Sequence, residues 1–289
     1  MGNIAPAITI LTPTCDLLYK DRQLEALEKQ TFRDFEWVIV DDAYEQNKGV
    51  QASFPVKHIP PQNPVLYVAL AAAMNDGIVL AEGEIVYFMN DYVIPEPFCL
   101  ERHWEVQQKF GGCMLSGGEW IMEDIPPLEF LIKDGQIITR DYRIALFENG
   151  FKEWTSIGDE LCEVGREGVQ NWWAGRNDSC PLEALLACNG FDEAFDGMWG
   201  GHDADIANRL MTYGLKYYID KKSRCKSYTH PRGRKKQVRS QEMQQSFQYT
   251  IINPKVEKGI YTANTEFLVM IPRNLREENG NNRRSPNCL

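Results

Sequence analysis

The sequence predicts an α/β fold in which helices join the strands of one sheet. Two observations lead to this prediction. The first hundred residues alternate between short apolar runs and stretches with helical periodicity, which is typical of strands joined by crossover helices. Of the 289 residues, 43% are apolar and 11% are aromatic, which is enough for a large buried core. We therefore expect a single globular domain made of two fused halves.

The first half is assigned to residues 1–97. A β-branched run at 7–11 ends at Thr12-Pro13-Thr14, which predicts a strand followed by a loop. A helix should follow, with Asp21 as its N-cap and its end near Gln30. The remaining expected elements are strands at 35–40, 56–59 and 84–89, and an alanine-rich helix at 66–81 that Gly83 stops.

The second half is assigned to residues 98–231. Helices are expected at 98–107, 181–188 and 202–213, and a strand at 215–219. The stretch between about 108 and 171 looks irregular, apart from a hairpin around Asp134-Gly135. Residues 232–289 should form a basic loop and a C-terminal extension that is disordered from Glu277 onward.

Charge and composition exclude several classes of protein. The net charge of −10 argues against a protein built to bind nucleic acid over its whole surface. One basic stretch between Lys221 and Arg239 breaks the acidic trend, and it indicates either a local anion site or a solvated loop. The sequence shows no transmembrane segment, export signal or C-x-x-C pair, so a cytoplasmic location is expected.

Acidic side chains follow two of the expected strands. Asp41 and Asp42 come after the strand at 35–40, and Asp91 comes after the strand at 84–89. Because ligands of open α/β sheets bind beyond the carboxyl ends of the strands, these three carboxylates should converge at one edge. The alternative for Asp41 and Asp42 is a capped strand end or a turn.

Five segments, taken in order, resemble the GT-A fold glycosyltransferases, especially family 2. They are ITILTPT at 8–14, QTFRDFEWVIVDD at 30–42, AEGEIVYFMND at 81–91, NGFDE at 189–193 and WGGHDADIANRL at 199–210. The last segment is similar to the galactosyltransferase-type C-terminal segment. The resemblance implies a Rossmann-like mixed sheet of the GT-A type, flanked by helices. It also implies transfer of a sugar from a nucleotide sugar, with UDP expected, to an acceptor hydroxyl.

The resemblance places the donor on both halves of the chain. It implies that the base and ribose lie against the first two strand ends, at Thr12, Pro13, Thr14, Asp41 and Asp42. A carboxylate can accept from the imide N–H of uracil, which suits Asp42 to this role. Other expected contacts to the donor sugar or diphosphate are Asn90, Arg176, Asn177, Arg232 and Arg234.

A divalent cation is also implied. Asn90-Asp91-Tyr92 stands in the place of the family's D-x-D metal motif, although it offers one carboxylate only. Asp91 is the expected ligand, and His230 is expected as the second because related enzymes often place a histidine after the last core strand. An imidazole ligand favours Mn²⁺ over Mg²⁺.

The resemblance makes Asp203 the general base of an inverting transfer, because one carboxylate must take the acceptor proton. The alternative is that Asp203 caps the helix at 202–213. The expected acceptor or sugar pocket consists of Trp172, Trp173, Trp199, Gly200, Gly201 and His202. His202 replaces a glutamate that is usual in this motif. For each tryptophan, packing in the core is the alternative.

Two other functions stay open. A sugar-1-phosphate nucleotidyltransferase should carry a glycine-rich phosphate loop after the first strand, but residues 11–17 contain no glycine. A non-catalytic module that binds a nucleotide sugar would account for the incomplete metal motif. The acceptor is not identified; a glycan is favoured, and the basic stretch keeps nucleic acid possible.

Overall fold

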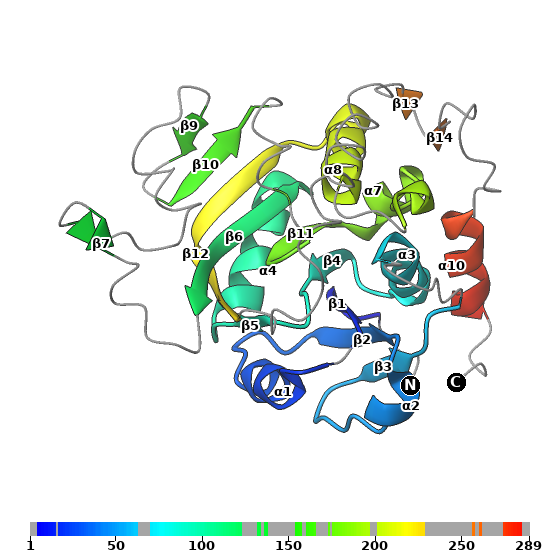
Figure 1. Ribbon diagram of the computed structural model, residues 1–289. Helices are drawn as coiled ribbons and strands as arrows, with labels where there is room; N and C mark the ends of the chain where they lie inside the picture. Colours follow the sequence, from blue (N-terminus) through cyan, green and yellow to red (C-terminus); the bar gives the residue numbers. More distant parts are fainter. Residues whose placement is uncertain are drawn as a thin grey trace.

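The computed structural model describes residues 5–15, 17–62, 70–122, 132–133, 136–137, 154–157, 160–165, 173, 175–196, 201–228, 256–257, 260–261 and 274–284. Its main feature is a ten-stranded sheet in the order β3-β2-β1-β4-β11-β6-β12-β10-β9, with β5 paired to β12 (Figure 1). The strands are β1 (Ile8–Thr14), β2 (Phe35–Asp41), β3 (Val56–Ile59), β4 (Ile85–Phe88), β5 (Val93–Pro95), β6 (Met114–Met122), β9 (Trp154–Ile157), β10 (Leu161–Val164), β11 (Asp178–Pro181) and β12 (Tyr217–Tyr228).

Parallel and antiparallel pairs both occur in the sheet. Strands β3, β2, β1 and β4 are parallel to one another, whereas β11 is antiparallel to both β4 and β6. Beyond β11, β12 runs parallel to β6. The predicted mixed α/β sheet is therefore confirmed, and it continues from the first half of the chain into the second through the pairing of β4 with β11.

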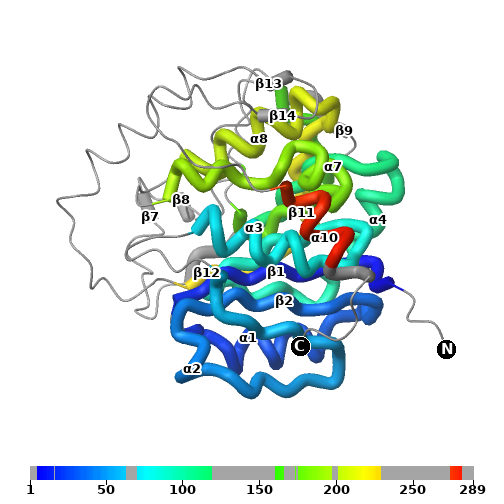
Figure 2. The backbone as a smooth tube through the Cα atoms, turned by 90° about the vertical axis from the view of Figure 1, so that its right-hand side faces the viewer, coloured from blue at the N-terminus to red at the C-terminus, as the bar shows by residue number. Residues whose placement is uncertain are grey.

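Helices cover both faces of the sheet (Figures 1 and 2). They are α1 (Lys20–Glu28), α2 (Tyr44–Asn47), α3 (Leu70–Leu80), α4 (Cys99–Phe110), α7 (Leu182–Ala187), α8 (His202–Tyr213) and α10 (Leu275–Arg284). One core lies between the sheet and α3, α7, α8 and α10, and a second lies between the sheet and α1 and α4. Alternate residues of β2 serve the two cores: Val38 belongs to the first, and Trp37 and Ile39 to the second. None of the described helices is long and apolar enough to cross a membrane.

Two predictions for the first half were wrong in detail. The segment Thr12-Pro13-Thr14 is the end of β1 and not a loop. Pro13 is tolerated there because the pairing of β1 with β4 ends at Leu11, so the strand has a neighbour on one side only. Asp21 lies in the first turn of α1, and Tyr19 occupies the N-cap position.

More strands occupy the second half than were predicted. Strands β6, β9 and β10 lie in the stretch that was expected to be irregular. Gly117 and Gly118 weaken the strand pattern of β6, and β9 and β10 are only four residues long each. The expected hairpin pairs β7 (Ile132–Lys133) with β8 (Gln136–Ile137), and its turn residues Asp134 and Gly135 lie outside the described residues.

The expected disorder from Glu277 onward was also wrong for residues up to Arg284, which belong to α10. This helix packs beside α3 (Figure 2). The buried Asn279 amide donates to the carbonyls of Ile78, Val79 and Ala81 at 3.3, 3.0 and 2.9 Å. A side chain of α10 thereby caps the C-terminal end of α3. A short hairpin of β13 (Val256–Glu257) and β14 (Ile260–Tyr261) precedes α10.

Candidate active site

The carboxyl ends of β1, β2 and β4 meet at one edge of the sheet, as predicted. Thr14 at the end of β1 is in register with Asp41 at the end of β2, and the Asp42 amide donates to Thr14 O at 3.0 Å. On the other side, Thr14 Oγ1 donates to Asp91 Oδ2 at 2.8 Å. Thr14 therefore links the two acidic strand ends, and this edge is the first part of the candidate site.

The neighbouring aspartates Asp41 and Asp42 lie in different surroundings. Asp41 is fully buried, and it accepts hydrogen bonds from the Ala43 amide at 2.8 Å, Asn47 Nδ2 at 3.0 Å and His58 Nε2 at 3.1 Å. Burial alone would raise the pKa of Asp41, but these hydrogen bonds outweigh it and the pKa is lowered. Its contacts are those of a capped strand end, which is the alternative that the sequence left open.

Asp42, in contrast, is exposed at the sheet edge. Although the residue as a whole is exposed, partial desolvation of its carboxylate, together with the nearby charge of Asp41, raises the pKa of Asp42. The Thr12 side chain is not available at this edge, because it is buried and its hydroxyl accepts from Trp37 Nε1 at 2.9 Å. Of the side chains predicted to hold the base, Asp42 is the one that the structure leaves open to a ligand, whereas Thr12 and Asp41 are engaged in the protein interior.

The segment at the predicted metal site offers oxygen atoms. The Asp91 side chain is held by Thr14, and Asn90 Nδ2 donates to Tyr92 OH at 3.1 Å. Among the described residues, Asn90 Oδ1 is a buried oxygen with no hydrogen-bond partner. A carboxylate next to an unsatisfied amide oxygen suits Mg²⁺ or Mn²⁺, which both accept oxygen ligands. The described part of the chain contains no group of three or more His, Cys, Asp and Glu side chains that could hold a metal ion.

His230 lies outside the described residues, but the strand that leads to it is described. The amide of Tyr228 donates to Tyr92 O at 2.9 Å, one residue after Asp91. The ring of Tyr228 stacks on Tyr19, with 5.0 Å between centroids, and the guanidinium of Arg22 lies 4.6 Å from its centroid. The end of β12 is thus fixed beside the segment that carries Asp91.

The second part of the candidate site is the start of α8. Gly201 occupies the N-cap position with φ of 92°, and no side-chain cap bond to α8 is found in the described residues. Asp203 lies in the first turn with its side chain 26% exposed, and its Oδ2 is 3.4 Å from His202 Nε2. Asp203 is therefore not the N-cap of this helix, and its carboxylate is open to solvent.

Asp205, two residues further along α8, is committed to structure. It is 4% exposed and accepts from Arg209 Nε at 2.9 Å and from Nη2 at 2.5 Å. The same guanidinium donates to the carbonyls of Cys188 and Gly190. Sequence reasoning did not assign this pair, although the i,i+4 spacing of an acid and an arginine on one helix could have indicated it.

Asp196 is a further carboxylate near α8 that sequence reasoning did not assign. It accepts from the amides of Ala71 and Ala72 in the first turn of α3, at 2.8 and 2.9 Å. Burial raises the pKa of Asp196 to about 6, although these two bonds act in the opposite direction. It follows that Asp196 ties the segment before α8 to the start of α3.

The expected pocket residues are described only in part. Trp173 is 2% exposed, and its ring packs between Phe88 and Tyr217, with centroids 6.0 and 6.1 Å away. These contacts match the core-packing alternative, so no face of the ring is open to a sugar. Trp172, Trp199, Gly200, Arg232 and Arg234 lie outside the described residues.

Arg176 and Asn177 lie in a loop between Trp173 and β11. The Arg176 amide donates to Asp178 Oδ2 at 3.0 Å. Asn177 was predicted to contact the donor, but its surroundings do not favour this role. Its side chain is fully buried, and the amide nitrogen and oxygen are both bonded to protein groups.

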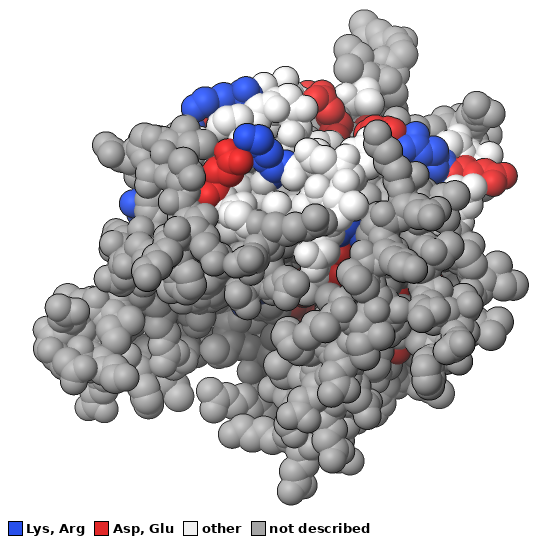
Figure 3. Space-filling model, turned by 90° about the horizontal axis from the view of Figure 1, so that it is seen from above, with Lys and Arg blue, Asp and Glu red and all other residues white. Residues whose placement is uncertain are grey.

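The basic stretch begins on a strand. Lys222, Arg224 and Lys226 are exposed on β12, whereas the intervening Ser223 and Cys225 are buried. Lys222 forms an ion pair with Glu160. Such pairing, like solvation, is typical of charged side chains on a surface strand. On the face seen in Figure 3, the described basic and acidic side chains are interspersed. The basic residues after Tyr228 lie outside the described part of the chain.

Comparisons with known proteins bear on this architecture. Residues 174–234 match the sequence model of a family described as the N-terminal domain of galactosyltransferase. Validoxylamine A glucosyltransferase from Streptomyces hygroscopicus subsp. jinggangensis (strain 5008) is 24% identical over 241 residues, which is 75% of this chain and 54% of that protein. The enzyme of the same name from subsp. limoneus is 25% identical over 242 residues, 75% of this chain and 51% of that protein. The chain thus spans about half the length of these relatives.

Solved structures show the same fold at low identity. S. aureus TarS 1-349 in complex with UDP-GlcNAc has a TM-score of 0.55 at 14% identity, covering 86% of this chain and 68% of that one. The mannosyltransferase PcManGT from Pyrobaculum calidifontis, in complex with GDP-Man and Mn²⁺, has a TM-score of 0.56 at 18% identity, covering 88% of this chain and 67% of that one. The chain therefore has the fold of the GT-A glycosyltransferases, as its sequence motifs predict.

Proposed function

We infer that the protein is an inverting glycosyltransferase that moves a sugar from a nucleotide sugar to an acceptor hydroxyl. One observation carries this proposal. The fold places Thr14, Asp42 and Asp91 at one sheet edge, and it presents a solvent-accessible carboxylate, Asp203, in the first turn of α8. A nucleotide site and a candidate base are the two parts that such a transfer requires. The matched galactosyltransferase segment and the glucosyltransferase relatives support the same activity.

The donor is proposed to be a UDP-sugar. The exposed Asp42 carboxylate can accept from the imide N–H of uracil. TarS and PcManGT were solved with UDP-GlcNAc and GDP-Man, which are both nucleoside diphosphate sugars. This shared chemistry supports the donor class and does not identify the sugar.

A divalent cation is proposed at Asp91, with Asn90 Oδ1 as a further oxygen and His230 as the second protein ligand. The bond from the Tyr228 amide to Tyr92 O supports this pairing, since it brings the chain within two residues of His230 next to the Asp91 segment. When bound, the cation neutralises charge on the departing diphosphate. A histidine ligand favours Mn²⁺, the ion present in the PcManGT complex.

Asp203 is proposed to act as the general base. Its carboxylate takes the proton of the acceptor hydroxyl while that oxygen forms a bond to the anomeric carbon. The bond from the anomeric carbon to the diphosphate oxygen breaks on the opposite side, and the nucleoside diphosphate leaves with the electron pair. An α-linked donor then gives a β-linked product. Asp205 cannot replace Asp203, because it is buried against Arg209.

The acceptor is proposed to be a glycan that binds near α8. Gly201 and His202 directly precede Asp203 there, and Trp172, Trp199 and Gly200 remain candidates for the same pocket. Arg232 and Arg234 follow His230 closely and are proposed to contact the donor diphosphate, with a polyanionic acceptor such as nucleic acid as the alternative. These roles rest on the resemblance of the motifs.

Calorimetry with UDP-sugars tests the donor and metal proposals. The wild type should bind one UDP-sugar with Mn²⁺ and lose most of the affinity in a chelator. Asp91→Ala should bind weakly under both conditions, whereas Asp203→Asn should bind like the wild type but release nucleotide about 10²- to 10⁴-fold more slowly in the presence of acceptor. Equal affinity with Mn²⁺ and chelator, or unchanged affinity in Asp91→Ala, would contradict the metal site. Binding without any nucleotide release by the wild type would favour the non-catalytic module, and formation of UTP and sugar 1-phosphate from the UDP-sugar and added pyrophosphate would favour the nucleotidyltransferase.

A further inference from the structure

The loop at residues 175–177 follows an unusual backbone path beside the proposed base. Gly175 and Asn177 both have positive φ, 63° and 55°. A β-carbon at Gly175 would lie 3.3 Å from Asp203 Oδ1 and 3.4 Å from Met74 Cε, so the loop backbone packs directly between α8 and α3. Asparagine is one of the few residues with a side chain that adopts this left-handed conformation. The path of the loop next to Asp203 thus depends on what holds Asn177.

The side chain of Asn177 is held by five hydrogen bonds inside the protein. Its Nδ2 donates to Gly118 O at 2.9 Å and to Ser223 O at 2.8 Å. Its Oδ1 accepts from Tyr87 OH at 3.0 Å, Cys99 Sγ at 3.2 Å and His103 Nε2 at 3.0 Å. Both amide hydrogens are therefore used, and the oxygen is fully satisfied.

The contact between Asn177 and His103 determines that one ring nitrogen of His103 carries a hydrogen. Because Asn177 Oδ1 can only accept, His103 Nε2 must carry a hydrogen. Ser179 Oγ lies 2.8 Å from the other ring nitrogen, Nδ1, and it also accepts from Gln107 Nε2 at 2.9 Å. The hydroxyl of Ser179 can thus donate to Nδ1 of a neutral ring. In this way residues of α4 and β11 hold the imidazole that donates to Asn177 Oδ1.

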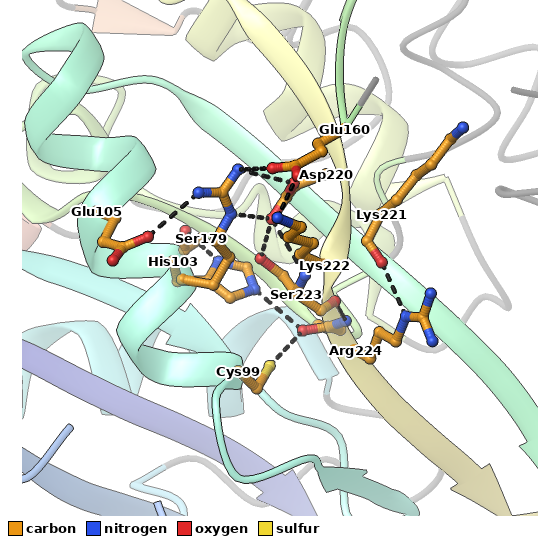
Figure 4. Close-up of polar contacts among 12 residues, drawn as sticks. Cys99, His103, Glu105, Glu160, Ser179, Asp220, Lys221, Lys222, Ser223 and Arg224 are labelled. Atoms are coloured by element: carbon orange, nitrogen blue, oxygen red, sulfur yellow. Dashed lines mark hydrogen bonds and ion pairs between the residues drawn. The ribbon is translucent and has the colours of Figure 1, made fainter. Parts of the chain in front are cut away.

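The side-chain nitrogen of Asn177 bonds to the backbone at an irregularity in the sheet. The register of β12 against β6 shifts between Asp220 and Arg224, and the Asn177 amide bonds to Ser223 O within this bulge. A β-carbon at Gly117 would overlap both Ser223 O and Asn177 Nδ2, so the approach requires glycine. Asp220 stabilises the bulge by accepting from Ser223 Oγ at 2.8 Å (Figure 4). It also accepts from Arg102 Nε of α4 at 2.8 Å.

The geometry points to Asn177 as a positioning residue for sugar transfer. Its amide joins β4, α4, β6 and β12 to the loop at 175–177, and the loop backbone in turn confines the Asp203 carboxylate on the side of Gly175. Asn177 does not contact the donor; it sets the position of the base relative to the acceptor hydroxyl. The inference rests on the proposed function of Asp203. A misplacement of about 1 Å at a reacting group can lower turnover by about 10²-fold.

Two matched variants test this role. Asn177→Gly removes the amide and keeps a residue that adopts positive φ. Asn279→Ala removes another buried amide that donates to backbone carbonyls, in α10, where alanine suits the helix. Both variants should lower the midpoint of urea unfolding. Only Asn177→Gly should lower kcat, by about 10- to 100-fold, with the UDP-sugar dissociation constant within about threefold of the wild type.

The outcomes separate this inference from the proposed function. If the wild type transfers no sugar, the proposed function fails. If the wild type is active and Asn177→Gly keeps the kcat of Asn279→Ala, the positioning role alone is refuted. Should Asn177→Gly prove insoluble, Tyr87→Phe decides, because it removes one donor to Asn177 Oδ1. Its kcat should fall about threefold or more at unchanged donor affinity, and an unchanged kcat refutes the role.

Discussion

Replacing Thr14 by valine tests the proposed coupling between the end of β1 and the metal site. The Thr14 hydroxyl is buried, donates to Asp91 Oδ2 at 2.8 Å and accepts from the Leu17 amide at 2.8 Å. Valine has nearly the same shape and has no hydroxyl, so it removes both bonds. The Asp91 carboxylate loses a group that orients it, and the Leu17 amide, in a residue with φ of 48°, loses a partner.

Loss of the two bonds should have two separate effects, one on donor affinity and one on the free energy of unfolding. A hydrogen bond to a charged group contributes about 1.5 to 3 kcal/mol, which corresponds to about 10- to 100-fold in a dissociation constant. Outer partners of metal ligands have effects of about 10- to 100-fold on metal affinity. We therefore expect Thr14→Val to weaken Mn²⁺-dependent binding of the UDP-sugar by about tenfold or more. The unsatisfied Leu17 amide should lower the free energy of unfolding by about 1 to 3 kcal/mol.

Thr14→Ser is the matched control, because it keeps the hydroxyl and loses one methyl group. Isothermal titration calorimetry at fixed Mn²⁺ concentration measures binding, and urea denaturation measures stability. The serine variant should bind the donor within about threefold of the wild type. If Thr14→Val binds as tightly as Thr14→Ser, or more tightly, Thr14 does not orient a metal ligand and the reasoning is refuted.

Three further predictions concern the groups around α8 and the basic segment. Asp205→Asn leaves the buried Arg209 guanidinium without a counter-charge, so urea denaturation should show a free energy of unfolding that is lower by about 3 kcal/mol. The kcat of the folded variant should stay within about twofold of the wild type. An unchanged stability would contradict the pairing. Burial raises the pKa of Asp196 to about 6, above its ordinary value of 3.8, so the folded protein binds this proton more tightly than the unfolded chain does. The stability of the wild type relative to Asp196→Asn should therefore increase as the pH falls from about 6 to about 4. Parallel curves of stability against pH for the two proteins would refute this. Reversing the charges of Arg232 and Arg234 should raise the donor KM and lower kcat, and an effect confined to a polyanionic acceptor would instead support a nucleic-acid substrate.

The converging sheet edge could be predicted because it depends on local patterns. Apolar runs followed by Asp41, Asp42 and Asp91 specify where parallel strands end, and strands of one sheet present those ends together. The helix at 202–213 was predicted with the observed bounds, since Gly201 and Gly214 mark its two ends and Ile206 and Leu210 its buried face.

The side-chain roles at that edge could not be predicted, because they depend on contacts between distant residues. Asp41 and Asp42 are neighbours in the sequence, yet His58 and Asn47 engage only Asp41. Asn177 has the residue type of a ligand contact, and only the approach of β6 and β12 shows that its amide is used inside the protein. Short strands such as β9 and β10 likewise form through pairing, β10 with β12 and β9 with β10, and their four-residue runs carry little signal of their own.

The most direct test of the account is the reaction of Asp203→Asn together with the stereochemistry of the wild-type product. The asparagine side chain is nearly isosteric, and the 26% exposure of Asp203 makes a large loss of stability unexpected. We expect wild-type donor affinity, a fall in kcat of about 10²- to 10⁴-fold, and a β-linked wild-type product from an α-linked UDP-sugar, identified by NMR of the anomeric proton. An α-linked product, or an Asp203→Asn variant with the kcat of the wild type, would contradict the inverting mechanism with Asp203 as its base.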